Sequence, residues 1–189
     1  MFAFPIEEKK DWCQWAWYKE VFSKEECERI KNSFSEKDLA NATTGRGRDL
    51  HHRNTDVQFI DATPGTIDIF KRLAQVVKQA NNRHWNFDLS GLYEGLQLTR
   101  YREGQFYKWH QDSGGGTFSK RKLSIVVQLS DPKDYEGGEL QFLGFEKEQI
   151  PLSQGTAIIF PSFNPHQVTP VRSGVRYSLV AWVSGAPYR

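Results

Sequence analysis

The sequence predicts an α+β fold in which helices buttress a jelly roll or barrel of short strands. Apolar residues follow a helical period in the first half of the chain, and from about residue 90 the period changes to two. The 189 residues are enough for one core, and no linker divides them. We therefore expect a single domain over residues 1–189, with helical support over residues 20–85 and a jelly roll over about residues 90–185.

Two helices are expected in the first half of the chain. In residues 21–34, "VFSKEECERIKNSF", Ser23 precedes Glu26 by three positions, the spacing of a capping box, and apolar residues follow along one stripe. Residues 64–85 contain a second apolar helix face, formed by Ile69, Leu73, Val76, Val77 and Ala80. Residues 40–55 are polar, contain glycine and have no period, which indicates a loop before the short strand "DVQFID".

Six short segments with a period of two follow residue 90. They are "LQLTRY", "KLSIVVQLS", "GELQFL", "TAIIFPS", "HQVTPV" and "RYSLVAWV". Turn signals such as "SDPKDYEGG" and "FNP" separate them. Several short strands at regular spacing are typical of a jelly roll or barrel.

Composition excludes some classes of protein. The net charge is only +2 and the 25 basic residues are spread along the chain, so nucleic acid is not an expected partner. The two cysteines, Cys13 and Cys27, fit neither a disulfide framework nor a zinc motif. The start, "MFAFPIEEKKDW", does not resemble a secretory signal, and no long apolar segment predicts a membrane span. We expect a cytoplasmic protein with no membrane partner, and the sequence leaves its oligomeric state open.

The stretch "FYKWHQDSGGGTF", residues 106–118, contains candidate metal ligands. Within a strand, His110 and Asp112 would point to the same face, so both side chains could bind one ion. The remaining histidine after this stretch, His166, opens a later strand and is the candidate third ligand. Two imidazoles and one carboxylate match the facial triad of non-haem Fe(II) oxygenases, which leaves adjacent metal positions open.

A candidate anion-binding residue follows ten positions after His166. Arg176 lies in the apolar strand "GVRYSLVAWV", where a buried guanidinium needs an anionic partner. Ser178 shares its face of the strand. The two residues predict a carboxylate receptor, and a keto acid with two carboxylates would span from there to the metal.

The segment "YREGQFYKWHQD" fits the pattern YxxGxxYxxHxD, and "YEGGELQF" and "GTAIIFPSFNPHQVTPVRSGVRYSLVAWV" follow it. In these segments the chain resembles prolyl 4-hydroxylase-like 2-oxoglutarate and Fe(II)-dependent dioxygenases, over roughly residues 20–185. The resemblance implies a double-stranded β-helix. It also implies that His110, Asp112 and His166 bind iron and that Arg176 binds the far carboxylate of 2-oxoglutarate.

Further co-substrate residues are expected from this resemblance and from strand parity. Tyr101 and Tyr107 fall on the two motif tyrosines, and Tyr101 is expected to line the co-substrate pocket. Trp182 shares the face of Arg176 and Ser178 and is expected to overlook the metal. Where some relatives have a tyrosine this chain has Gln128, with Ser124 on the same face, and we expect a weaker amide contact with the carboxylate.

Two segments are candidates for contact with the substrate. Gly114, Gly115 and Gly116 are expected to form a pliable loop beside the metal. In the resembling enzymes a loop from the region of residues 40–55 closes over the peptide, so the same loop is a candidate lid here. Its basic residues are the candidate contacts: Arg46, Arg48 and Arg53.

The resemblance implies an enzyme that uses Fe(II), 2-oxoglutarate and O2, with ascorbate as a candidate reductant, and that releases succinate and CO2. It hydroxylates an unactivated C–H bond, and the leading substrate is a prolyl residue in a peptide or protein. No residue in the sequence demands proline, so a hydroxylase of a free amino acid or small metabolite is an alternative. A nucleic-acid oxidative demethylase and a non-catalytic jelly-roll binding module are further alternatives.

Overall fold

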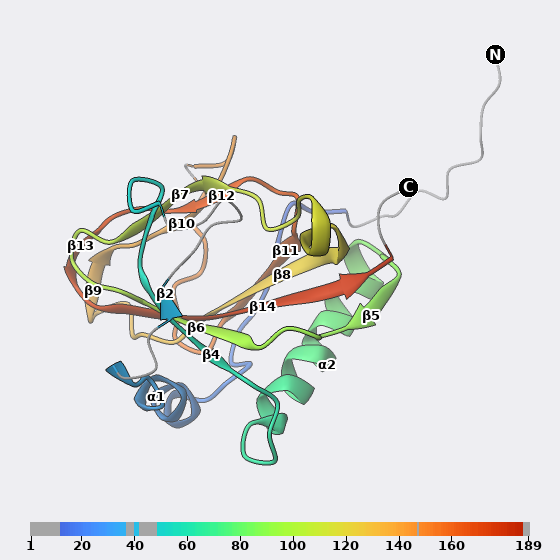
Figure 1. The fold of residues 1–189 in the computed structure, drawn as a ribbon, viewed down its shortest axis with the longest axis horizontal. Helices are drawn as coiled ribbons and strands as arrows, with labels where there is room; N and C mark the ends of the chain where they lie inside the picture. Colours follow the sequence, from blue (N-terminus) through green and yellow to red (C-terminus); the bar gives the residue numbers. More distant parts are fainter. Residues whose placement is uncertain (1–11, 37–39, 42–48, 147, 187–189) are drawn as a thin grey trace.

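The computed structural model describes residues 12–36, 40–41, 49–146 and 148–186. Two antiparallel sheets face each other, and in Figure 1 the helices α1 (Lys24–Asn32) and α2 (Ile67–His84) lie below the larger one. The larger sheet has the order β1 (Ala16–Tyr18), β11 (Ala157–Pro161), β8 (Arg121–Gln128), β14 (Arg176–Gly185), β6 (Leu96–Tyr101), β4 (Asp56–Ile60), β2 (Ala40–Asn41), and β5 (Leu89–Gly91) pairs with β14.

The smaller sheet has the order β10 (Leu140–Phe142), β12 (His166–Val168), β7 (Phe106–His110), β3 (Arg53–Asn54). A separate pair joins β13 (Val171–Gly174) to β9 (Tyr135–Gly137). The 3-10 helix η2 (Gly116–Lys120) connects β7 to β8. Strands that are distant in the sequence therefore become neighbours in both sheets. Among the described residues, no helix has the length and apolar character needed to cross a membrane.

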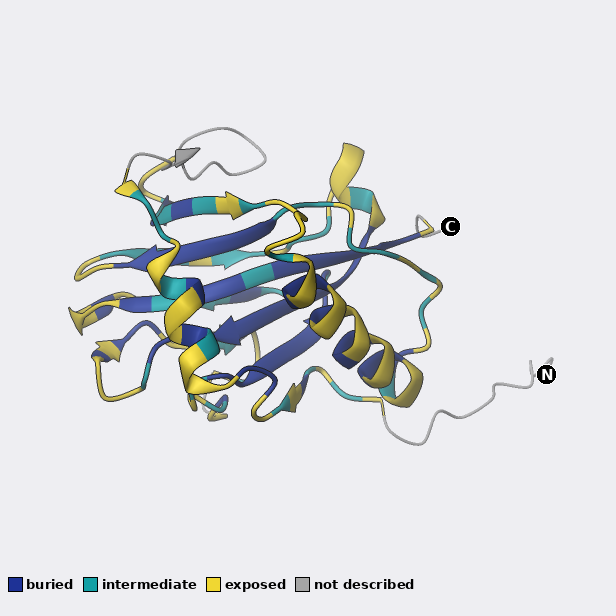
Figure 2. Ribbon diagram, turned by 90° about the horizontal axis from the view of Figure 1, so that it is seen from below, coloured by how far each residue is buried: buried dark blue, intermediate teal, exposed yellow. Residues whose placement is uncertain are grey.

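Both predicted helices are present, and each begins later and ends earlier than the predicted range. The capping box at α1 is confirmed, because the Ser23 hydroxyl accepts from the Glu26 amide at 3.2 Å and the Glu26 carboxylate accepts from the Ser23 amide at 2.8 Å. Figure 2 shows that α2 is buried on the side facing the strands and exposed on the other. The helical period in the sequence thus corresponds to one covered face.

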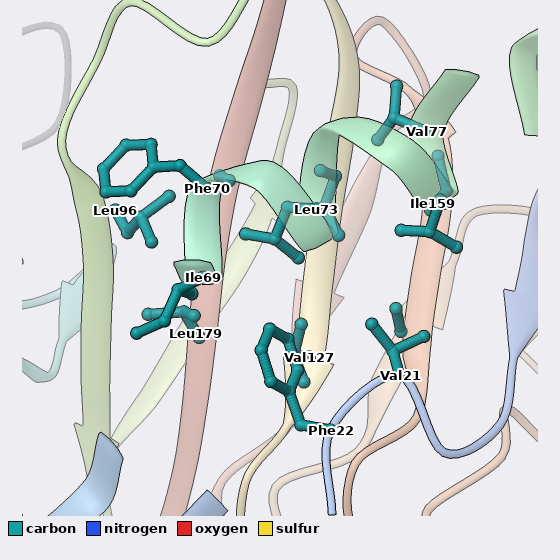
Figure 3. Close-up of a cluster of buried hydrophobic side chains, with 14 of the residues drawn as sticks. Val21, Phe22, Ile69, Phe70, Leu73, Val77, Leu96, Val127, Ile159 and Leu179 are labelled. Carbon is teal, nitrogen blue, oxygen red and sulfur yellow. The ribbon is translucent and has the colours of Figure 1, made fainter. Parts of the chain in front are cut away.

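The main core lies between the helices and the outer face of the larger sheet. Figure 3 shows Phe70, Leu73 and Val77 of α2 among side chains from the strands, including Leu96, Val127, Ile159 and Leu179. Alternate residues of the same strands, such as Val126, Ile158 and Phe160, belong to a second apolar cluster, which also contains Leu140 and Phe142 of β10. The period of two therefore corresponds to strands covered on both faces.

The space between the two sheets also contains polar groups. Four polar residues in the buried strands β8 and β14 are each at most 2% exposed: Ser124, Gln128, Arg176 and Ser178. Burying polar groups is unfavourable unless they are paired, so their presence in a core position marks a candidate site.

A close backbone contact anchors the start of α1 to the turn before β11. The amides of Val21 and Phe22 donate to the carbonyl of Gly155 at 3.0 and 3.3 Å. Gly155 has φ +80°, and an added Cβ would collide with the carbonyl oxygen of Phe22. Only glycine fits this position without moving the backbone.

The variant Gly155→Ala is expected to lower the free energy of unfolding by about 3 kcal/mol or more, because it adds a backbone collision to a strained φ. Gly104→Ala is the matched control, since Gly104 has φ +76° but nothing within 4 Å of an added Cβ. It is expected to lose only about 1–2 kcal/mol. Urea unfolding measures both values, and equal losses would contradict the role of the contact with Phe22.

Candidate functional site

The three predicted metal ligands meet between the sheets. His110 ends β7, His166 begins β12, and the two residues are direct partners in the antiparallel pairing. One ligand atom from each of His110, Asp112 and His166 lies within 4.8 Å of the other two. Asp112 Oδ1 is 3.7 Å from His110 Nε2, and Asp112 Oδ2 is 3.6 Å from His166 Nε2. This convergence fits one small cation.

Hydrogen bonds to the backbone fix how the two imidazoles are oriented. His110 Nδ1 is 2.8 Å from the carbonyl oxygen of Lys108, and His166 Nδ1 is 2.9 Å from that of Asn164. A carbonyl only accepts, so each Nδ1 carries the proton and each Nε2 lone pair is left for a metal. Burial, together with the neighbouring His166, lowers the pKa of His110 to about 3. Its imidazole is therefore neutral at physiological pH, as a metal ligand must be.

Asp112 is held by a different means from the one predicted. β7 ends at His110, so Asp112 lies beyond the strand, and its amide donates to the carbonyl of Ser162 at 2.9 Å. Its carboxylate accepts a hydrogen bond from the Ser124 hydroxyl at 2.6 Å. The hydroxyls of Ser124 and Ser162 are also hydrogen-bonded to each other at 2.9 Å. Burial raises the pKa of Asp112, but the two imidazoles and Ser124 more than offset it and hold the pKa below its ordinary value. Ser124, expected to face the co-substrate, directs its hydroxyl at Asp112.

The variant Ser124→Ala is expected to weaken metal binding by about 10- to 100-fold, because it removes the hydrogen bond that orients the Asp112 carboxylate. Ser130→Ala is a matched control. Ser130 is also buried, just beyond the end of β8, but its hydroxyl accepts from the Tyr177 amide. Titration with Mn(II) measures both affinities, and a Ser124→Ala variant with unchanged affinity would contradict the orienting role.

Arg176 forms a second candidate centre, a buried guanidinium. Its side chain is 1% exposed, and Nη2 donates to Gln128 Oε1 at 2.9 Å. Within the described part of the chain, Nε and Nη1 have no hydrogen-bond partner although both are buried. Gly138 lies against the stem of Arg176, where an added Cβ would be 3.0 Å from Cδ. A buried guanidinium with two unsatisfied donor groups fits a carboxylate ligand.

Three further predicted co-substrate residues surround Arg176. The ring of Tyr101 is 5.5 Å from the guanidinium carbon, and Tyr101 pairs with Arg176 across β6 and β14. Ser178 pairs with Gln128 across β14 and β8. Burial raises the pKa of Tyr101 above its ordinary value, so its hydroxyl stays protonated and able to donate. The structure thus brings these side chains together around the unsatisfied donors.

Trp182 lies opposite Ser124 in the sheet, and its indole Nε1 is a buried donor with no partner among the described residues. The guanidinium of Arg121 stacks on its ring at 3.7 Å and donates to the Asp112 carbonyl at 3.4 Å. The β8–β14 register shifts between Val183 and Ser184, an irregularity that can redirect a side chain such as Arg121. The sequence reasoning missed Arg121, and the only signal was a basic residue opening an apolar strand.

The candidate lid residues have different locations. Arg46 and Arg48 lie outside the described residues. Arg53 lies in β3, which pairs with β7, so it is buried instead of forming part of an open loop. Its guanidinium carbon is 4.5 Å from the centre of the Tyr107 ring, which stacks on His110 at 3.4 Å. Arg53 therefore supports the aromatic ring beside a candidate metal ligand.

The three glycines that follow Asp112 in the sequence do not have one role. Added Cβ atoms at Gly114, Gly115 and Gly116 would meet nothing within 4 Å. Gly116 has φ +64° and begins η2, so the expected loop is partly helical. Crowding therefore does not explain these glycines, and a backbone requirement is visible only at Gly116.

Comparison with known proteins finds similarity to oxygenases and hydroxylases. Residues 96–184 match the family described as the 2OG-Fe(II) oxygenase superfamily. A PKHD-type hydroxylase of Synechococcus sp. (strain CC9902) is 37% identical over 99 residues, which is 52% of this chain and 45% of that protein. A PKHD-type hydroxylase of Picosynechococcus sp. (strain ATCC 27264 / PCC 7002 / PR-6) is 29% identical over 87% of this chain and 75% of that protein. The chain spans about half the length of the first curated relatives that it matches.

Solved structures share the fold at low sequence identity. A prolyl-4-hydroxylase from Pseudomonas putida has a TM-score of 0.69 at 21% identity, covering 92% of this chain and 93% of that one. A prolyl hydroxylase from Trichoplax adhaerens, in complex with a hypoxia inducible factor peptide fragment, has a TM-score of 0.71 at 18% identity, covering 91% and 84%. These likenesses confirm the predicted α+β fold with a double-stranded β-helix core.

Proposed function

We propose that this chain, whose residues 96–184 match the 2OG-Fe(II) oxygenase superfamily, is a prolyl 4-hydroxylase-like 2-oxoglutarate- and Fe(II)-dependent dioxygenase. One observation supports this most strongly. Two imidazole Nε2 atoms and a carboxylate converge between the sheets, and Tyr101 interacts electrostatically both with Asp112 and with Arg176, a buried arginine with unsatisfied donors. The first group fits a cation, and the second fits the far carboxylate of a keto acid.

The donor set fits Fe(II) in number and chemical type. His110, Asp112 and His166 would hold the ion as two nitrogens and one oxygen, leaving adjacent positions for small ligands. Arg176, with Gln128 and Ser178 beside it, would hold the far carboxylate of 2-oxoglutarate. When bound, iron supplies the redox chemistry with O2 and 2-oxoglutarate that yields succinate, CO2 and a hydroxylated product.

The protein's own contribution is placement and the exclusion of water. Lys108 and Asn164 carbonyls fix the imidazole tautomers, and Ser124 fixes the Asp112 carboxylate. Tyr101 and Trp182 are 4% and 6% exposed, so their rings lie away from solvent, and each keeps a polar donor. A dry, shaped pocket strengthens the attraction between Arg176 and a carboxylate.

The proposed substrate is a prolyl residue in a peptide or protein. Support comes from the solved relatives, which are named prolyl hydroxylases, one of them in complex with a peptide fragment. A free amino acid or small metabolite is the alternative substrate. The cytoplasmic location and the use of ascorbate stay predictions.

The test is turnover of 2-oxoglutarate by the purified protein with Fe(II) and ascorbate in air. Succinate release is expected without added substrate at a low rate, and a prolyl peptide that gains the mass of one oxygen atom would identify the substrate class. His110→Ala is expected to abolish release, while His51→Ala, which changes an exposed histidine, keeps it. Succinate release that is equal in wild type and His110→Ala would contradict the proposed function.

A further inference from the structure

A pocket of about 800 Å³ lies at the end of β14, outside the residues described so far as the candidate site. Its walls come from three places: the loop after β5, the helix η2 and the last residues of β14. In Figure 1, η2 (yellow) and β5 (green) lie near the red end of β14. A volume of this size lies within the range of ligand-binding pockets and leaves room for a large side chain.

One wall is an aromatic ring that is fixed before any ligand arrives. Tyr93 is 72% exposed, yet its hydroxyl donates to the carbonyl of Ser90 at 2.9 Å. Gly91 lies beneath the ring, since an added Cβ there would be 3.5 Å from a ring carbon of Tyr93. The ring is therefore held against the backbone while much of its surface is open. Such pre-organisation reduces the entropy lost on binding.

The other aromatic wall connects the pocket to the metal centre. Phe118 of η2 is 37% exposed, and the Arg121 guanidinium carbon is 4.5 Å from the centre of its ring. Arg121 also stacks on Trp182 at 3.7 Å and donates to the Asp112 carbonyl. The pocket is thus linked to a candidate metal ligand by a short series of direct contacts.

The charges of the pocket do not favour a charged ligand. Glu94 accepts from Arg121 through both carboxylate oxygens, so its charge is already paired. Lys120, which also lines the pocket, is exposed, so solvent and salt screen its charge. Two open aromatic rings instead favour an apolar ring, because stacked or edge contacts stabilise beyond the area they bury.

We infer that this pocket binds an apolar, ring-bearing side chain of a peptide substrate, at a position flanking the residue that reacts at the metal. The inference rests on the proposed function and makes it more specific. A free amino acid has one side chain and cannot place a reacting side chain at the metal and a second side chain in this pocket. A peptide can occupy both places at once, so Tyr93 and Phe118 would be specificity-determining residues for a peptide.

The test uses short labelled peptides with a single proline and a tyrosine, or a serine in its place, at each flanking position in turn. Binding is measured by fluorescence anisotropy to the protein loaded with Mn(II) and 2-oxoglutarate, so no turnover occurs. One tyrosine peptide is expected to bind about tenfold more tightly than its serine counterpart. Tyr93→Ala and Phe118→Ala are expected to lose this preference and to keep their affinity for 2-oxoglutarate.

Trp17→Ala is the control, because Trp17 is also an exposed aromatic residue, 48% exposed, on the edge strand β1. It is expected to retain the preference. If Mn(II) and 2-oxoglutarate bind but no tyrosine peptide is preferred, or Tyr93→Ala keeps the preference, the inference is wrong and the proposed function stands. If Mn(II) and 2-oxoglutarate do not bind, both are wrong.

Discussion

Replacing Arg176 with alanine is expected to weaken 2-oxoglutarate binding by about 100-fold or more while metal affinity changes by less than about twofold. The guanidinium is almost fully buried, and its Nε and Nη1 have no partner among the described residues. A carboxylate placed there gains charged hydrogen bonds in a water-poor space, where they are strong. Calorimetric titration of 2-oxoglutarate into the Mn(II)-loaded protein measures the loss.

Two further arginine variants make this prediction specific. Arg176→Lys keeps the charge but not the planar fork, so its affinity is expected to lie between those of wild type and Arg176→Ala. Arg102→Ala removes a guanidinium that is 52% exposed and paired with Glu36 at the surface, and it is expected to bind 2-oxoglutarate normally. Equal affinity in wild type and Arg176→Ala would show that the far carboxylate binds elsewhere.

Replacing His166 with alanine is expected to reduce metal affinity by more than about 100-fold, because only two of three ligands remain. His166 is 4% exposed, and the bond between its Nδ1 and the Asn164 carbonyl holds its Nε2 toward the other two ligands; alanine removes this nitrogen. Titration with Co(II), followed by its visible spectrum, measures the affinity. His51→Ala, at an exposed position, is expected to bind Co(II) as wild type does.

A His166→Ala variant that retains wild-type affinity would require a ligand set without that residue. Circular dichroism distinguishes this outcome from loss of folding, because the fold itself is expected to remain. The main core against the helices does not include the imidazole, although the rings of Phe142 and Phe160 in the second cluster contact it.

The strands and the candidate metal ligands were predictable because both produce recognisable patterns in the amino-acid sequence. A period of two identifies a strand, and the spacing of His110, Asp112, His166 and Arg176 matches a family motif. The detail of Asp112 was wrong, since a backbone bond to Ser162 holds it beyond the end of β7. His110 and Asp112 do lie close together, as predicted, but not because they share one face of a strand.

Other features depend on contacts between segments distant in the sequence. Arg53 is buried because β3 pairs with β7, a contact that no local pattern in residues 40–55 indicates. Arg121 reaches Asp112 beside a register shift between β8 and β14, and such irregularities are not visible in the sequence. The open ring of Tyr93 depends on a bond to Ser90 and on the space that Gly91 leaves. These positions follow from the tertiary structure and not from the motif.

The central claim is that one site binds Fe(II) and 2-oxoglutarate together. The most direct measurement is the visible charge-transfer absorbance of a keto acid chelated to Fe(II), recorded without oxygen for wild type, His110→Ala and Arg176→Ala. We predict a band in the wild type, no band in His110→Ala and a weakened band in Arg176→Ala that strengthens at higher 2-oxoglutarate concentration. Wild-type protein that binds Fe(II) but gives no band with saturating 2-oxoglutarate would contradict the account.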